Sequence, residues 1–498
     1  MVINEARLFS ELRTLIGELG SNGGLMGPSV YDTAQVLRLY PEKSSIDRTL
    51  EWLTIQQQAD GGWGDPSVPL ARTATTLAAL LALATHAGTS HPAISAGVRF
   101  LREQAAVWEG TLPEDLPAGV ELLVPYLTDE ATALGLDVPP VSAPLRALGE
   151  RRQALLARIQ IRAGTTIVHS WEAWGKEPQA ELLDETGSVG HSPAATAAWL
   201  RAAQGHASLC EARARAQRYL ERAALATGDG AVGVMPTAWP IDRFEQSFSL
   251  YVLLIAGLLD HPALADVVAQ QVQSLERAMR PNGIGYSDYF APDGDDTAAA
   301  CAVLASRGQP GYLSALDHFA VGDYFCAWQG ELQAATSVTS HAIHALRLAG
   351  GEFERAAEAL LKQQCENGRW VGDKWNRSWV YTTSQALIAL SGHAPEARIQ
   401  SAIDALLKGQ HDCGAWGDPA PSGEETAYAT LALRSLQRDG TLPAYANEAL
   451  QRGERWLADP QRAFDGEDVA YWLAKEPYRP RRLARLWELA ALAAAHLG

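Results

Sequence analysis

The sequence predicts an all-α protein built from two α/α-barrel domains, that is, barrels of helical hairpins. Alanine and leucine recur at helical spacing over long stretches, as from Arg72 to Ala84, whereas alternating β-branched runs are almost absent. A turn of the form Gln-x3-Gly-x-Trp occurs at Gln57–Trp63, Gln364–Trp370 and Gln410–Trp416 with identical spacing. Such a repeat indicates similar helical units packed side by side.

The repeated turns predict how neighbouring helix pairs are joined. The Gln at the end of one helix is able to bond backbone groups of the next turn while the Trp packs over it, so we expect these Trp side chains to be architectural. One turn lies near the N-terminus and two follow residue 360, with a Pro- and Gly-bearing stretch at 228–242 between them. Since 498 residues exceed one ordinary core, we place a domain boundary near residue 245.

Composition excludes several classes of protein. The formal net charge of −17 argues against a nucleic-acid partner, which needs a basic surface. Five scattered cysteines without a Cys-x-x-Cys pair indicate a reducing compartment and no zinc site. No apolar stretch is long enough to span a bilayer, and the first residues lack the pattern of a signal peptide. These features predict a cytoplasmic protein without stable membrane insertion.

The segment Ala291–Thr297 places three carboxylates, Asp293, Asp295 and Asp296, just before a helical run. Asp296 or Thr297 is able to cap this helix. Because like charges this close do not all ionise at ordinary cost, we expect one proton to be retained near neutral pH, which provides a usable acid. On these residues alone, a solvated cap or a Ca²⁺ or Mg²⁺ loop remains an equal alternative.

Asp-x-Asp-Asp beside Gln-x3-Gly-x-Trp turns resembles the class II terpene cyclases. The likeness runs from about residue 27 to 480 and is greatest to the class II diterpene cyclases of the bacterial copalyl diphosphate synthase type. Five further segments carry it: Ser29–Gln35, Val168–Glu172, Ser192–Trp199, Pro236–Glu245 and Glu424–Tyr428. The resemblance implies two α-barrel domains named γ and β, with the substrate held between them.

By this resemblance, residues 1–25 form a helix that packs with the β domain, residues 26–245 form the γ domain, and residues 246–498 form the β domain. Asp295 is then the proton donor, while Asp293 and Asp296 position it. Protonating a carbon–carbon double bond gives a carbocation, so the cavity should be lined by aromatic faces. The aromatic residues in or near the matching segments are Trp239, Phe248, Tyr286, Trp328, Trp375, Trp379 and Tyr381.

The reaction ends when a base removes a proton from the last cation. In similar plant enzymes that make the ent product, a His and an Asn hold a water for this step. His169 matches the His, but Thr237 stands at the Asn position and has only one hydroxyl. This departure leaves open the product stereoisomer, a rearranged clerodane-type or halimane-type skeleton, or a different base. His169 is equally compatible with a satisfied core histidine.

The diphosphate end needs positive charge. The segment Pro113–Glu121 resembles the family's acidic Mg²⁺ segment, with Glu114 as the first ligand and Asp115 beside it. Since Mg²⁺ keeps several waters and phosphate supplies further oxygens, such a sparse site is adequate, although an ordinary turn is the alternative. Lys475, in a segment that resembles the family's Trp-Ile-Gly-Lys, and Arg151 or Arg152 are the predicted basic partners.

The resemblance predicts an enzyme that cyclises geranylgeranyl diphosphate to a bicyclic copalyl-type diphosphate. The Asp-Asp-x-x-Asp and Asn/Ser/Glu patterns of class I terpene synthases are absent, so the product should keep its diphosphate and pass to a separate class I enzyme. A C15 substrate would use the same acid. Two other classes compete: a protein prenyltransferase β subunit, for which we find no Asp, Cys and His zinc set, and a non-catalytic helical repeat scaffold.

Overall fold

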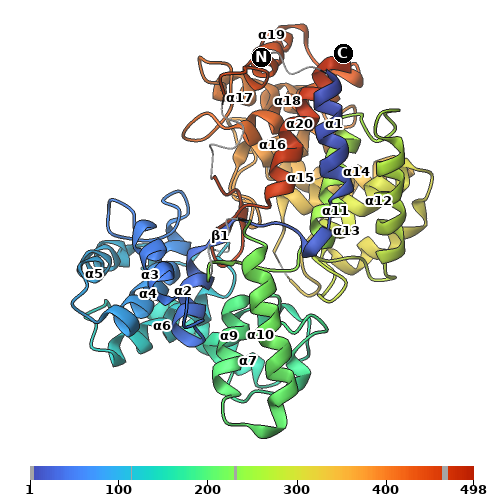
Figure 1. Ribbon diagram of the computed structural model, residues 1–498. Coiled ribbons are helices and arrows are strands. Elements are labelled where there is room, and N and C mark those ends of the chain that lie inside the picture. Colours follow the sequence, from blue (N-terminus) through green and yellow to red (C-terminus); the bar gives the residue numbers. More distant parts are fainter. Residues whose placement is uncertain (1–4, 114, 229–232, 332, 463–468, 498) are drawn as a thin grey trace.

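A computed structural model describes residues 5–113, 115–228, 233–331, 333–462 and 469–497. Within them the protein is almost entirely helical and forms two lobes, an N-terminal lobe coloured blue to green and a C-terminal lobe coloured yellow-green to red (Figure 1). The only strands in these ranges are three two-residue antiparallel pairs. The predicted all-α class is confirmed.

The C-terminal lobe is a closed ring of inner helices. Each inner helix packs against the next, and the last packs against the first. The ring comprises α11 (Asp242–Ile255), α13 (Gly294–Ser306), α14 (Thr336–Ala349), α16 (Trp379–Leu390), α18 (Gly423–Arg438) and α20 (Arg481–Leu497). Outer helices α12 (Ala265–Ala278), α15 (Glu354–Lys362), α17 (Glu396–Gly409) and α19 (Asn447–Leu457) and the 3₁₀ segment η6 (Pro310–Phe319) cover it.

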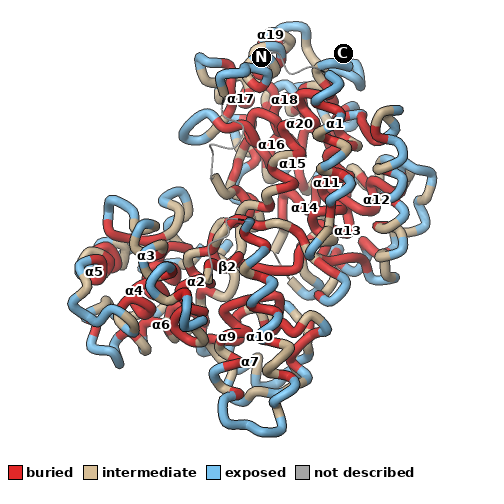
Figure 2. Tube along the Cα trace, in the orientation of Figure 1, coloured by how far each residue is buried: buried red, intermediate tan, exposed pale blue. Residues whose placement is uncertain are grey.

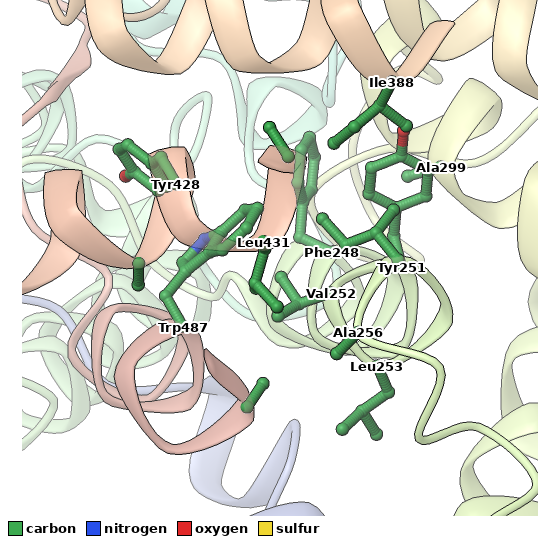
Figure 3. Packing of buried hydrophobic residues seen from close by; sticks show 14 of the residues in the cluster. Phe248, Tyr251, Val252, Leu253, Ala256, Ala299, Ile388, Tyr428, Leu431 and Trp487 are labelled. Atoms are coloured by element: carbon green, nitrogen blue, oxygen red, sulfur yellow. The ribbon is translucent and has the colours of Figure 1, made fainter. Parts of the chain in front are cut away.

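The core of this lobe lies inside the ring. Figure 2 shows the inner helices as mostly buried, whereas the outer helices expose one side. One buried cluster contains Phe248 and Tyr251 from α11, Tyr428 from α18 and Trp487 from α20 (Figure 3). The Tyr428 and Trp487 rings meet edge to face with centroids 4.7 Å apart. Such pairs add stability beyond their buried area.

The N-terminal lobe repeats this plan with shorter helices. Its inner ring consists of α2 (Val30–Leu39), α4 (Pro69–Ala87), α6 (Val120–Ala133), α8 (Trp171–Trp174) and α9 (Pro193–Ala202), each in contact with the next and α9 with α2. The outer helices are α3 (Ile46–Ile55), α5 (Pro92–Gln104), α7 (Ala143–Leu156) and α10 (Cys210–Leu225). Helix α1 (Glu5–Gly17) belongs spatially to the other lobe, where it packs against α12 and α20.

The three Gln-x3-Gly-x-Trp turns tie helices together as the sequence predicts. In the first, the Gln57 amide donates to the Gly61 carbonyl at 2.7 Å and to the Ala93 carbonyl of the next outer helix at 2.9 Å. Trp63 is fully buried and its Nε1 donates to the Leu53 carbonyl at 2.7 Å. The turns at Gln364 and Gln410 make the corresponding bonds. Their architectural role is confirmed.

Two short strand pairs lie where the lobes meet. Strand β1 (Pro28–Ser29) pairs with β2 (Met235–Pro236), just before the first inner helix of each lobe. Strands β5 (Trp472–Leu473) and β6 (Pro477–Tyr478) form a hairpin whose tip, Lys475 and Glu476, is buried against the N-terminal lobe. At this tip the Ala118 amide donates to the Ala474 carbonyl at 3.0 Å.

The strands β3 (Ala320–Val321) and β4 (Tyr324–Phe325) form the third pair, in the C-terminal lobe. None of the helices in the described ranges is both long and apolar enough to cross a membrane.

Candidate active site

The acidic segment forms the beginning of the inner helix α13. Asp293 has extended backbone angles and its carboxylate accepts the Asp296 amide at 2.8 Å, so Asp293 is the N-cap. The prediction that Asp296 or Thr297 caps the helix is therefore wrong. Thr297 is engaged elsewhere, because its hydroxyl contacts the backbone of Ile284. Asp295 and Asp296 consequently lie in the first turn, where the helix dipole favours negative charge.

Asp295 faces the next inner helix of the ring, α14. Its side chain is 11% exposed, and its Oδ1 lies 2.6 Å from Nδ1 of the fully buried His341 on α14. On the other side of the imidazole, Nε2 lies 3.2 Å from Gln385 Oε1 and 3.3 Å from the Tyr381 hydroxyl. Nδ1 is thus the ring nitrogen that faces Asp295, and an N–H there donates to the carboxylate. The imidazole thus stabilises the negative charge that remains after Asp295 loses its proton.

The two flanking carboxyl groups hold protons more tightly than usual. Burial, followed by the charge of Asp296, raises the pKa of Asp293 well above its ordinary value. Burial raises the pKa of Asp296 to about 7, although hydrogen bonds from Asp293 and Ser247 oppose the shift. The cluster therefore retains a proton near neutral pH, as expected from its crowding. The leading cause is burial rather than like-charge repulsion.

Aromatic rings enclose the acid. A narrow pocket of about 20 Å³ is lined by the three aspartates, by Ala327 and by aromatic side chains. These side chains are Phe244, Phe248, Tyr286, Trp328, Trp375, Trp472 and Tyr478. Rings present a negative face that stabilises a nearby cation. The predicted residues Phe248, Tyr286, Trp328 and Trp375 all lie here.

A larger cavity adjoins this pocket and lies between the lobes. It has a volume of about 660 Å³, within the usual range for small-molecule sites. Trp328 and Trp375 line both spaces and so stand at their shared wall. The N-terminal lobe contributes residues from Gly110 to Leu122, one face of α7, and His169. The acid therefore lies behind the wall that Trp328 and Trp375 share with the larger cavity.

His169 lies in the wall of the larger cavity, whereas Thr237 lies outside its lining. His169 Nδ1 is 2.8 Å from the Gly190 carbonyl, so this nitrogen carries the proton and Nε2 keeps its lone pair. Burial, and then the positive charge of Lys475, lower the pKa of His169 to about 3. The Thr237 side chain is 1% exposed, and its hydroxyl has no hydrogen-bond partner within the described ranges.

Among the predicted basic residues, Arg151 lines the larger cavity, as does Arg152. Lys475 lies elsewhere. Its fully buried ammonium donates to Glu172 Oε1 at 2.7 Å and to Ser192 Oγ at 2.8 Å. The positive charge of Lys475, at the hairpin tip, is already paired with the buried carboxylate of Glu172 in the N-terminal lobe. This placement gives no support to diphosphate binding by Lys475.

Three predicted aromatic residues do not line the cavities. Trp239 packs on Tyr219 and donates to the Asn22 carbonyl at 3.2 Å. Trp379 donates to Asp418 at 3.1 Å near the surface. Tyr381 stands behind His341 and contacts its Nε2. The resemblance located these residues in the chain, but it did not show which way each side chain points.

The predicted metal ligands are placed only in part, because Glu114 lies outside the described residues. Asp115 is exposed and lines a separate cavity of about 210 Å³ together with Leu116, Pro117 and Lys374, which also line the larger cavity. Among residues that the structure describes, no three His, Cys, Asp or Glu side chains gather to hold a metal ion. A carboxylate at this edge still fits a Mg²⁺ that takes most of its ligands from phosphate and water.

The sequence reasoning missed His341, Phe244, Trp472, Tyr478 and Lys374. His341 had a readable signal, since it is one of two histidines in an inner helix, Thr336–Ala349, most of whose other residues are small or apolar. Trp472 lies in the segment that contains Lys475, and the sequence analysis considered only the lysine of this segment. Lys374 lines the larger cavity, where it forms an ion pair with Glu331.

Comparisons with known proteins agree with this geometry. The chain is 47% identical to the (+)-kolavenyl diphosphate synthase of Herpetosiphon aurantiacus, in an alignment that covers 99% of this chain and 98% of that protein. It is 32% identical to the copalyl diphosphate synthase of Streptomyces cyslabdanicus, covering 94% and 92%. No family model matches the chain.

Among solved structures, the ent-copalyl diphosphate synthase from Streptomyces platensis matches with a TM-score of 0.80 at 27% identity. The match covers 98% of this chain and 99% of that one. Neither competing class, the prenyltransferase β subunit nor the scaffold, accounts for this full-length similarity. The chain belongs to the class II diterpene cyclase family.

Proposed function

We propose that this enzyme cyclises geranylgeranyl diphosphate to a bicyclic diphosphate, with Asp295 as the acid. The observation that carries this proposal is the buried Asp295 carboxyl, hydrogen-bonded to His341 and surrounded by aromatic rings. Its proton passes to the terminal double bond, and the two neighbouring double bonds then close onto the cation. Because the sequence lacks the Asp-Asp-x-x-Asp and Asn/Ser/Glu patterns with which class I enzymes ionise a diphosphate, the diphosphate stays attached.

Each side chain around the acid has a separate task. The His341 Nδ1–H bond stabilises the Asp295 carboxylate as the proton leaves. Asp293 caps α13 and fixes the first turn on which Asp295 stands. The rings of Phe248, Trp472 and their neighbours stabilise the cation and exclude water, which would otherwise capture it.

Termination is assigned to His169 on the wall of the larger cavity. With Nδ1–H held by the Gly190 carbonyl, its Nε2 is a neutral acceptor for a proton of the final cation. Its low pKa keeps it neutral at physiological pH. Thr237 offers only a buried hydroxyl outside the lining of this cavity, which supports a product other than that of the enzymes with an intact His and Asn pair.

The diphosphate is assigned to the outer end of the larger cavity, beside Arg151, Arg152 and Lys374. A Mg²⁺ held by Asp115, whose cavity shares Lys374 with the larger one, would neutralise part of the diphosphate charge, and the sequence predicts Glu114 as a further ligand. Arg152 is already oriented by Glu121, 3.4 Å away. Within the described ranges Arg151 forms no ion pair, and it is therefore the first choice for a direct contact.

Replacing Asp115 by Asn, or Glu114 by Ala, is expected to raise the Mg²⁺ concentration needed for half-maximal activity severalfold. The reason is that each change removes one of few anionic ligands. Titration of the activity with Mg²⁺ measures this directly. Asp47→Asn, on the exposed helix α3, is the matched control. Titrations identical to that of the unmodified enzyme would exclude this segment as the metal site.

Activity is expected to fall as the pH rises above about 7, the pKa of Asp296. Below this value Asp296 is neutral. Above it Asp296 is ionised, so the carboxylate formed on Asp295 faces a second negative charge and proton transfer becomes harder. A kcat profile from about pH 6 to 9 tests this, because Asp296→Asn should flatten the fall. An Asn variant with an unchanged profile would assign the fall to another group.

The product diphosphate is proposed to pass to a separate class I terpene synthase in the cytoplasm. The experiment that tests the function incubates purified protein with Mg²⁺ and geranylgeranyl diphosphate, removes phosphate enzymatically, and identifies the alcohol by mass spectrometry and chiral chromatography. Standards derived from kolavenyl and copalyl diphosphates decide the skeleton. Farnesyl diphosphate tests a C15 substrate, and no turnover of either substrate would contradict the proposal.

A further inference from the structure

The turn Ser188–Ser192 holds a buried histidine that the steps above do not use. His191 is 1% exposed and has a φ of 58°, in the left-handed region. This conformation costs energy for a residue other than glycine, so the surrounding contacts must hold it in place. The turn leads directly into helix α9, and its Gly190 carbonyl lies beside the candidate base His169.

His191 joins two buried side chains from different lobes. Its Nδ1 lies 3.1 Å from Asp184 Oδ2, and its Nε2 lies 2.6 Å from Ser287 Oγ. Ser287 follows Tyr286, which lines the acid pocket. The order Asp, His, Ser is that of a nucleophilic triad, but Ser287 is fully buried and offers no surface to a substrate. The cluster therefore connects the lobes rather than performing its own chemistry.

The same turn supports the two segments assigned to termination. The Gly190 carbonyl accepts the Nδ1–H of His169 at 2.8 Å, and the His191 carbonyl accepts the Trp239 amide at 3.0 Å, two residues after Thr237. The packing is close, since a Cβ on Gly190 would lie 2.5 Å from the His169 backbone nitrogen. A shift of this turn therefore moves His169.

We propose that His191, held between Asp184 and Ser287, is a positioning residue that determines where the cation cascade ends. It fixes the Gly190 carbonyl, which in turn holds the His169 imidazole with Nε2 directed for proton removal. When the turn is released, the cation meets its base less often and loses its proton elsewhere or captures water. This inference rests on the proposed function and on His169 as the base.

The test uses Ser287→Ala and His191→Asn. Asn tolerates the left-handed conformation but is too short to bridge the same two partners. We expect each variant to consume geranylgeranyl diphosphate at nearly the unmodified rate, because Asp295 and His341 are untouched, while the share of by-products rises severalfold. Ser249→Ala is the matched control, since this serine is fully buried and its hydroxyl has no partner in the described ranges.

A His169→Ala background separates positioning from a merely structural role. There, adding His191→Asn should change the product ratio no further, because both act through the same base. A further change would show that His191 acts independently and would overturn the proposal, as would unchanged products in both single variants, even with a lower Tm. If the unmodified enzyme did not consume geranylgeranyl diphosphate, the proposed function would fall and this proposal with it.

Discussion

Asp295→Asn is expected to abolish cyclisation, with a loss of at least about 10³-fold in kcat, in the upper range for removing a general acid. The amide has no proton acidic enough to protonate a double bond. Its oxygen still accepts a hydrogen bond from His341 Nδ1–H, as the carboxylate oxygen does at 2.6 Å. The fold should therefore persist. Product formation is measured by mass spectrometry and stability by thermal unfolding.

The control for this change is Asp317→Asn, which alters an exposed carboxyl on η6 and should leave the activity unchanged. Asp293→Asn is a second comparison, because it keeps an N-cap side chain on α13. Substantial turnover by Asp295→Asn, with the unmodified product, would assign the proton to another group. Loss of activity together with a large drop in Tm would leave catalysis and folding unseparated, so the isosteric Asn is preferred to Ala.

His341→Leu is expected to lower kcat by about 10²- to 10³-fold, the usual cost of removing a donor to a developing anion. KM should change little, because His341 stands behind Asp295 and is absent from the residues that line either cavity. His341→Gln should recover part of the rate, since its amide retains a donor. Steady-state kinetics with geranylgeranyl diphosphate separates kcat from KM.

His318→Leu, on the exposed side of η6, is the control for the loss of a histidine. Equal losses in His341→Leu and His341→Gln, accompanied by equal falls in Tm, would indicate that His341 only supports the packing. A recovered rate in the Gln variant at unchanged Tm would support its role as the donor to Asp295.

The sequence was most informative where the structure of a short segment depends only on residues within that segment. Gln57 and Trp63 lie six residues apart; Gln57 bonds the turn and Trp63 bonds the preceding helix, so their spacing alone predicts the joint between helices. The acidic cluster was likewise recognisable because Asp293 and Asp295 stand together before a helical run. Its cap was misjudged, since choosing between Asp293, Asp296 and Thr297 depends on which backbone amide each side chain meets.

Features that depend on contacts between residues distant in the sequence could not be predicted from the sequence. His341 stands 46 residues after Asp295 and reaches it only because consecutive inner helices of the ring are neighbours. Lys475 was assigned to the substrate from its segment, whereas folding carries it into the N-terminal lobe beside Glu172. A basic side chain looks the same in sequence whether its charge faces a ligand or a buried carboxylate.

The β5–β6 hairpin sets a condition for protein engineering. Trp472 and Tyr478 at its base present rings to the acid, whereas Lys475 and Glu476 at its tip are fitted to carboxylate and hydroxyl groups of the opposite lobe. A chimera that joins halves of two related cyclases must therefore inherit residues 471–478 from the parent of its N-terminal half. Otherwise a mismatched tip would tilt the rings that guide the cation.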